Sequence, residues 1–63
     1  MNNKNHESEY RRQEEVRRLR LAHASLMEKC DRYFKEDNFR ESLYWFDRAK
    51  ETEARIRALG EEV

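Results

Sequence analysis

The chain has 63 residues, 44% of them charged, and a net charge of zero, so it forms one domain at most. Its single Cys excludes an internal disulfide, and chains this short rarely bury enough apolar surface alone, so we expect self-association. One Gly, no Pro and abundant Glu, Arg, Ala and Leu are typical of long exposed helices. No apolar run has the length of a membrane span or an export signal, which predicts a cytoplasmic protein without a membrane partner.

The first predicted element is a helix over about residues 8–36, preceded by a polar segment at residues 1–7 that we expect to be flexible. Ser8 is a residue type that favours the N-cap position. Apolar side chains then recur in steps of three and four, which places them on one stripe of a helix. The stripe consists of Val16, Leu19, His23, Leu26, Met27, Cys30, Tyr33 and Phe34. Tyr10 and Leu21 lie off the stripe and are candidate partner-binding residues.

A turn is predicted where the helical pattern breaks, at residues 35–38. Asn38 and Glu41 have the spacing of a capping box, in which each side chain bonds the backbone N–H of the other residue. Asp37 tolerates the left-handed conformation that commonly ends a helix. The turn is therefore expected to end one helix and begin the next.

A second helix is predicted over about residues 39–59, with Gly60 as its stop and a tail at residues 61–63. Its apolar face is broad. One edge contains Phe39, Leu43 and Phe46, and a heptad pattern contains Ser42, Trp45, Ala49, Thr52, Ile56 and Leu59. A face this wide exceeds what one partner helix covers.

Folding the chain at residues 36–38 gives an antiparallel two-helix hairpin and an all-α fold. The predicted register places Cys30 and Tyr33 near Phe39 and Leu43, Met27 near Phe46, and Val16 and Leu19 near Ile56 and Leu59. It also brings Arg12 to the acidic tail. We expect His23 to bond Glu53 or a partner chain.

In this register the strip around Trp45, Ala49 and Ile56 stays partly exposed in a single hairpin. Pairing two hairpins into a four-helix bundle would cover the strip, so we expect a homodimer. Each large side chain buried in this way stabilises by about 1.5–3 kcal/mol. The predicted core and dimer residues are Val16, Leu19, His23, Leu26, Met27, Cys30, Phe46, Ala49, Ile56 and Leu59.

Residues 22–49 resemble one hairpin of the tetratricopeptide-repeat family. The matching small and aromatic positions are Cys30, Tyr33, Phe39, Ser42, Phe46 and Ala49, and Asp37-Asn38-Phe39 takes the place of the Gly-Asp-Tyr turn. Lys29 stands where the repeat has Leu, and Ala54 where it has its closing Pro. Because a peptide groove needs about three repeats, the resemblance implies hairpin geometry, and the family's peptide ligands and groove residues are not carried over to this chain.

Enzyme chemistry is not expected. Cys30 and His23 are the one nucleophile and base on a shared stripe, but seven residues separate them by about 10 Å along a helix, too far for a hydrogen bond. With one Gly there is no phosphate-binding loop, and no residues have metal-ligand spacing. We therefore predict no catalytic residue, metal, cofactor or small-molecule substrate.

Aromatic residues of the second helix are the main candidates for partner binding, since Trp, Tyr and Arg anchor many interfaces. They are Tyr44, Trp45 and Phe39. Tyr44 lies among charged residues, which makes a core position hard to explain. For Trp45 and Phe39 the alternative is the dimer core itself.

Nucleic-acid binding is an alternative, with Arg11, Arg18 and Arg17 as the candidate residues. The helical spacing pairs Glu14 with Arg18 and Arg11 with Glu15, which is typical of a solvated ion-paired face. A phosphate-binding surface needs a basic stripe that carboxylates do not neutralise. A dimer could form such a stripe by aligning Arg11 and Arg18 of its two copies.

These observations predict a small non-enzymatic protein–protein interaction module, a regulator or inhibitor that binds and occludes a target protein. A transcription regulator is one such target, and phages and plasmids encode chains of this kind. One alternative is a Rop-like dimeric hairpin that binds RNA or DNA, a similarity of size and plan without a shared motif. A structural assembly subunit is the other.

Overall fold

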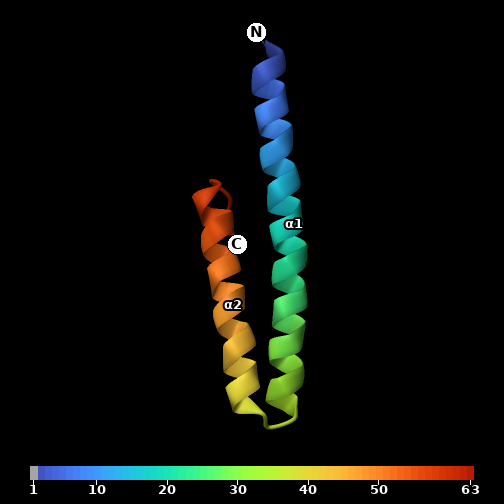
Figure 1. The fold of residues 1–63 in the computed structure, drawn as a ribbon, viewed down its shortest axis with the longest axis vertical. Coiled ribbons are helices and arrows are strands. Elements are labelled where there is room, and N and C mark those ends of the chain that lie inside the picture. Colours follow the sequence, from blue (N-terminus) through green and yellow to red (C-terminus); the bar gives the residue numbers. More distant parts are fainter. Residues whose placement is uncertain (1) are drawn as a thin grey trace.

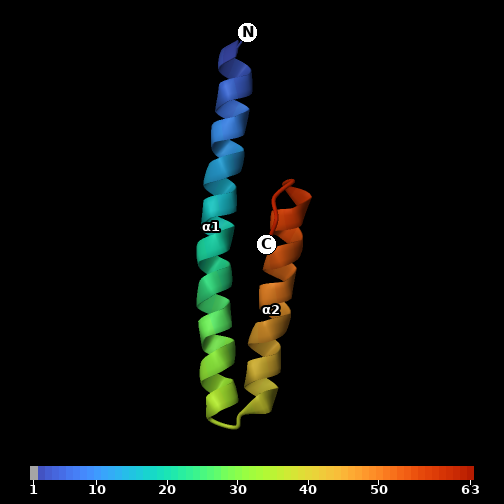
Figure 2. The ribbon, with the colours of Figure 1, turned by 180° about the vertical axis from the view of Figure 1, so that it is seen from behind.

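A computed structural model describes the backbone of residues 2–63 and the side chains of residues 8–63. It contains two helices, α1 (Asn2–Lys35) and α2 (Phe39–Ala58). They run antiparallel and side by side, and α1 extends well beyond the far end of α2 (Figure 1). Figure 2 shows the same pairing from behind. The molecule measures 55 × 15 × 13 Å, and the predicted all-α hairpin is confirmed.

The helix bounds differ from the expected ones mainly at the start of the chain. α1 begins at Asn2, so Ser8 lies inside the helix and not at its N-cap. A flexible segment was expected at residues 1–7. Met1 and the side chains of residues 2–7 lie outside the described residues, so the flexibility of this segment stays a prediction. α2 ends at Ala58 with Leu59 as its C-cap.

The turn between the helices is a Schellman motif. Asn38 N–H donates to the Tyr33 carbonyl at 2.9 Å, and Asp37 N–H donates to the Phe34 carbonyl at 3.1 Å. Asp37 has the expected left-handed backbone, with φ 59°. Asn38 Oδ1 accepts a 3.4 Å bond from Glu41 N–H, so half of the capping box forms. The other half would use the Asn38 N–H, which here donates to the Tyr33 carbonyl at the end of α1.

The same motif ends α2. Gly60 has φ 85°, its N–H donates to the Arg57 carbonyl at 2.9 Å, and Glu61 N–H donates to the Ile56 carbonyl at 3.2 Å. Gly60 therefore stops the helix as predicted. The turn directs the tail back toward α1.

The contact between the helices, here called the seam, runs along the heptad pattern of α2. On α2 the buried residues are Ser42, Ala49, Thr52, Glu53 and Ile56, and on α1 they are Val16 and Cys30. Ala49 is 0% exposed and Ile56 is 1% exposed, so the expectation that they would stay partly exposed is wrong. Small side chains at Ser42 and Ala49 allow the two helices to approach closely, and bulky ones at these positions would not fit.

The rest of the predicted core lies at the margin of the seam. Its half-buried members are Leu19, His23, Leu26, Met27 and Leu59. Phe46 is exposed in the single chain, which corrects the register that placed Phe39, Leu43 and Phe46 against α1. Neither helix, over the residues that the structure describes, is long and apolar enough to cross a membrane.

Candidate interaction site

Four large exposed apolar side chains gather at one edge of the hairpin, close to the turn. They are Phe34, Phe39, Leu43 and Phe46, which are 61%, 56%, 60% and 37% exposed, and together they are called the phenylalanine face. The rings of Phe34 and Phe39 meet edge to face with their centroids 5.4 Å apart, so the face is continuous across both helices. A cluster of this kind indicates a binding surface.

Helical spacing explains why these residues share an edge. On α2, Phe39, Leu43 and Phe46 follow steps of four and three, so they form a stripe beside the one that contains Ser42 and Ala49. On α1, Phe34 lies one turn beyond Cys30. The residues enclose a groove of ≈ 400 Å³ lined by Cys30, Phe34, Phe39, Ser42, Leu43 and Phe46.

The buried pair Cys30 and Ser42 lies at this groove with its polar atoms already in use. Ser42 Oγ donates to the Cys30 carbonyl at 2.9 Å, and Cys30 Sγ lies 3.4 Å from Ser42 Oγ. Because these groups are satisfied within the hairpin, the groove offers an occupant mainly apolar contact.

A second aromatic group lies on the opposite edge of the seam. Lys29 Nζ lies 4.4 Å from the Trp45 ring centroid, Tyr44 meets Trp45 edge to face at 5.0 Å, and the Arg48 guanidinium lies 5.7 Å from the Tyr44 ring. Trp45 Nε1 is buried without a hydrogen-bond partner among the described residues. The structure thus separates the predicted partner residues: Tyr44 and Trp45 lie on one edge, and Phe39 on the other.

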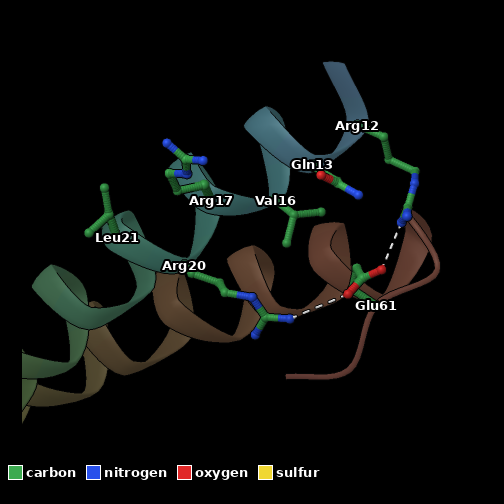
Figure 3. Close-up of a pocket in the computed structure, with 7 residues that line it drawn as sticks. All are labelled: Arg12, Gln13, Val16, Arg17, Arg20, Leu21 and Glu61. Atoms are coloured by element: carbon green, nitrogen blue, oxygen red, sulfur yellow. Dashed lines mark hydrogen bonds and ion pairs between the residues drawn. The ribbon is translucent and has the colours of Figure 1, made fainter. Parts of the chain in front are cut away.

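The two remaining partner candidates lie apart from both groups. Tyr10 and Leu21 are exposed on the part of α1 that is distant from the turn. Figure 3 shows Leu21 turned outward, beside a hollow of ≈ 440 Å³. In the single chain, these side chains therefore belong to no common site with the phenylalanine face.

An ion-pair cluster anchors the tail near this hollow. Arg12 bonds the Glu61 carboxylate at 2.8 Å and the Leu59 carbonyl at 3.0 Å, and Arg20 approaches Glu61 to 3.7 Å (Figure 3). Hydrogen bonds with Glu9, and then with Glu61, raise the pKa of Arg12 above its usual value. The expected contact of Arg12 with the acidic tail is confirmed.

The seam also contains the expected bond between His23 and Glu53. Their side chains meet at 2.8 Å. This hydrogen bond, followed by one from Lys50, lowers the pKa of Glu53 although burial acts in the opposite direction. The pair ties α1 to α2 midway along the seam.

The arginines proposed for nucleic acid do not form an unneutralised stripe. Arg17 pairs with Glu14 at 3.3 Å. Arg11 and Arg18 lie in a hollow that Glu14 and Glu15 also line. Acidic groups therefore lie close to all three arginines.

Phe34 and Leu43 are not among the candidate binding residues named from the sequence. Both had been placed on faces expected to close the hairpin. The useful signal was the small side chains of Ser42 and Ala49, which mark the α2 stripe that can approach another helix closely. Large residues beside that stripe are then left exposed.

Within the described part of the chain, no group of three or more His, Cys, Asp or Glu side chains is placed to hold a metal ion. No protein-family model, curated protein or solved structure matches the chain. The resemblance of residues 22–49 to a tetratricopeptide-repeat hairpin therefore rests on the residues alone.

Proposed function

We propose that this chain is a non-enzymatic protein–protein interaction module that pairs with a second copy of itself through the phenylalanine face. The pair is a four-helix bundle, and the surface that remains open binds and occludes a target protein, in the manner of a regulator or inhibitor. The observation that carries the proposal is the exposure of four large apolar side chains on one continuous edge.

The energies favour pairing. Covering a fully exposed Phe or Leu side chain stabilises by about 1.5–3 kcal/mol. The side chains of the face are 37–61% exposed, so each contributes roughly half of that, and a dimer covers the face on both copies. Association costs on the order of 4–15 kcal/mol in lost translational and rotational freedom. Burial of the two faces together can offset this cost. Among the side chains of residues 8–63, the buried apolar ones are Val16, Cys30, Ala49 and Ile56, and Ile56 is the one large side chain buried completely. A core this small gains much from a second layer of helices.

A second copy is the partner that matches the face best. The face combines three Phe and one Leu, and a copy offers an equal apolar area in the same shape. Two-fold pairing brings one patch against itself, so no separate complementary surface is required.

The target protein is assigned to the other edge of the seam. There Tyr44 is exposed, Trp45 is half-buried, and Lys29 and Arg48 flank them. Aromatic and Arg side chains of this kind often dominate binding energy. Pairing through the phenylalanine face leaves this edge open.

Sedimentation equilibrium at micromolar concentration tests the pairing. The parent chain is expected to be a dimer, and Leu43→Ser with Phe46→Ser is expected to be a monomer. Leu21→Ser is the matched control, because Leu21 is as exposed but lies on another surface. A folded, monomeric parent chain contradicts the proposal, as does equal dissociation by the control. If the double variant loses helix content, the helix content of the parent chain is measured on dilution instead. A parent chain whose fold depends on pairing is expected to lose helix as it is diluted.

Capture of the target is tested separately. Tyr44→Ala is expected to weaken retention of a specific protein from a lysate of the source cells, and Leu21→Ala to leave it unchanged. Equal retention by Tyr44→Ala removes the assignment of this edge without affecting the dimer.

Nucleic-acid binding is less well supported, because carboxylates accompany Arg11, Arg17 and Arg18. Affinity for RNA and DNA is expected to be weak at moderate salt. A tight complex that weakens steeply with salt, and that is lost in Arg11→Ala with Arg18→Ala, would favour this alternative instead.

A further inference from the structure

We infer that the two copies pair in opposite directions about a two-fold axis at the level of Cys30 and Leu43. Only the halves of the hairpins next to the turn then overlap, and the two charged ends point away from each other. This inference rests on the proposed homodimer and adds its arrangement.

The first argument is the spacing of the apolar residues on α2. Phe39 lies four residues before Leu43, and Phe46 lies three residues after it. The stripe is therefore nearly symmetrical about Leu43. A two-fold axis there, perpendicular to the helices, sets Phe39 against Phe46 of the other copy and Leu43 against Leu43.

The same spacing occurs on α1. Met27 lies three residues before Cys30, and Phe34 lies four residues after it. The bond of 2.9 Å from Ser42 Oγ to the Cys30 carbonyl places the centres of the two stripes at one level of the hairpin. One axis therefore serves both helices, and it brings Phe34 against Met27 of the other copy. Every large apolar side chain of the face meets another apolar one.

The second argument is charge beyond the overlap. On the part of the hairpin distant from the turn lie Arg17, Arg20 and Arg57, each paired with a carboxylate at 3.3–3.8 Å, of Glu14, Glu61 and Glu53 respectively. Copies that ran in the same direction would press these charged ends together and remove water from side chains that already have partners, which costs free energy. Opposite directions keep these ends apart and in water. Interactions between the two ends over more than the Debye length of about 8 Å are then screened at physiological salt.

Opposite pairing also creates an attraction. Lys50 lies seven residues after Leu43, and Glu36 lies seven residues before it. The axis therefore carries Lys50 of each copy to the turn of the other copy, where Glu36 and Asp37 are both exposed. Asp31 lies near the axis as well, and the repulsion between its two copies opposes part of this attraction.

Distances between spin labels test the arrangement. Each label is attached to one introduced Cys in a Cys30→Ala chain, at Asp47→Cys or Ala58→Cys, both exposed positions. Ala58 lies fifteen residues beyond Leu43, so opposite pairing separates its two labels by about 45 Å, and same-direction pairing by no more than about 25 Å. Labels at Asp47 lie within about 25 Å of each other in both arrangements.

The outcomes separate this inference from the proposed function. A short Asp47 distance with a long Ala58 distance supports opposite pairing. Short distances at both positions would support the homodimer but show same-direction pairing, which overturns the inference. The absence of any distance between copies at either position overturns the homodimer, and the inference with it.

A charge exchange gives an independent test. Lys50→Glu and Glu36→Lys are each expected to weaken dimerisation by roughly 3- to 10-fold, and the double variant to recover most of the loss. Within one chain the two positions lie about 20 Å apart along the helix, so only contact between copies pairs them. Additive losses in the double variant would overturn opposite pairing. Glu51→Lys, also exposed, is the matched control for a charge reversal on α2.

Discussion

Ser42 Oγ donates a 2.9 Å hydrogen bond to the Cys30 carbonyl, across the seam and beside the phenylalanine face. Ser42 is buried, so water cannot replace this bond. Ser42→Ala is expected to lower the free energy of unfolding by about 1 kcal/mol. Urea unfolding at one fixed protein concentration measures the loss, because association would otherwise add to it. Ser25→Ala, at an exposed position of α1, is the control, and equal stability of the two variants would contradict the prediction.

Ala49 lies in the seam and is 0% exposed. Ala49→Leu adds three carbon atoms where the seam has no room, and we expect it to destabilise by about 1–3 kcal/mol through overpacking. Thermal and urea unfolding measure the change. Ala54→Leu makes the same substitution at an exposed position of α2 and is expected to alter stability by no more than about 0.5 kcal/mol. Similar losses in both variants would mean that the seam tolerates bulk at position 49.

Glu53 links stability to pH. Its carboxylate bonds His23 at 2.8 Å and Lys50 at 3.4 Å, and Arg57 lies 3.8 Å away. The His23 bond, ahead of the Lys50 bond, holds the pKa of Glu53 below its ordinary value of 4.5. A carboxylate with a lowered pKa in the folded state contributes stability that is complete above the ordinary value and is lost as the pH falls through the lowered one.

Glu53→Gln is therefore expected to be less stable than the parent chain at neutral pH, with the difference shrinking below the ordinary Glu value of 4.5. Urea midpoints measured from neutral to acidic pH follow this difference. Glu51→Gln is the control, since Glu51 is exposed and nearby. A difference between Glu53→Gln and the parent chain that stays constant with pH would contradict the role of the carboxylate.

The turn between the helices and the end of α2 could be predicted because local chemistry determines them, whereas the start of α1 at Asn2, ahead of Ser8, was not predicted. The left-handed backbone at Asp37, the cap at Asn38 and the stop at Gly60 each depend on one residue and its nearest neighbours. The link between His23 and Glu53 was also predictable, because once the turn is placed, equal rise along both helices fixes which residues lie opposite.

The face that α2 turns toward α1 was not predicted. Two stripes compete on α2, one with Phe39 and Phe46 and one with Ser42 and Ala49, and a rotation of less than half a turn exchanges them. Apolar periodicity favours the larger side chains. The structure selects the smaller ones, because close approach of the backbones lets Ser42 bond α1 and leaves no space for Phe. Because Ser42 and Ala49 pack against α1, the stripe with Phe39 and Phe46 stays exposed and forms part of the candidate binding surface.

Gly60 offers a test of the turn that ends α2. Its φ of 85° is unfavourable for an L residue, while a Cβ added there would meet nothing within 4 Å, so the cost of Gly60→Ala is conformational and not steric. We expect a loss of about 1 kcal/mol in the free energy of unfolding. The carboxylate of Glu61, which this turn brings to Arg12 and Arg20, would be displaced with it.

A chain synthesised with D-alanine at position 60 is the matched control. The D residue favours positive φ and restricts the unfolded chain more than Gly, so stability is expected to stay equal or to rise by about 0.4–1 kcal/mol. Urea unfolding of the three chains at one concentration compares them. Equal losses for the L and D residues would show that the added methyl group itself is not tolerated. No loss for the L residue would mean that the tail turn contributes little to stability.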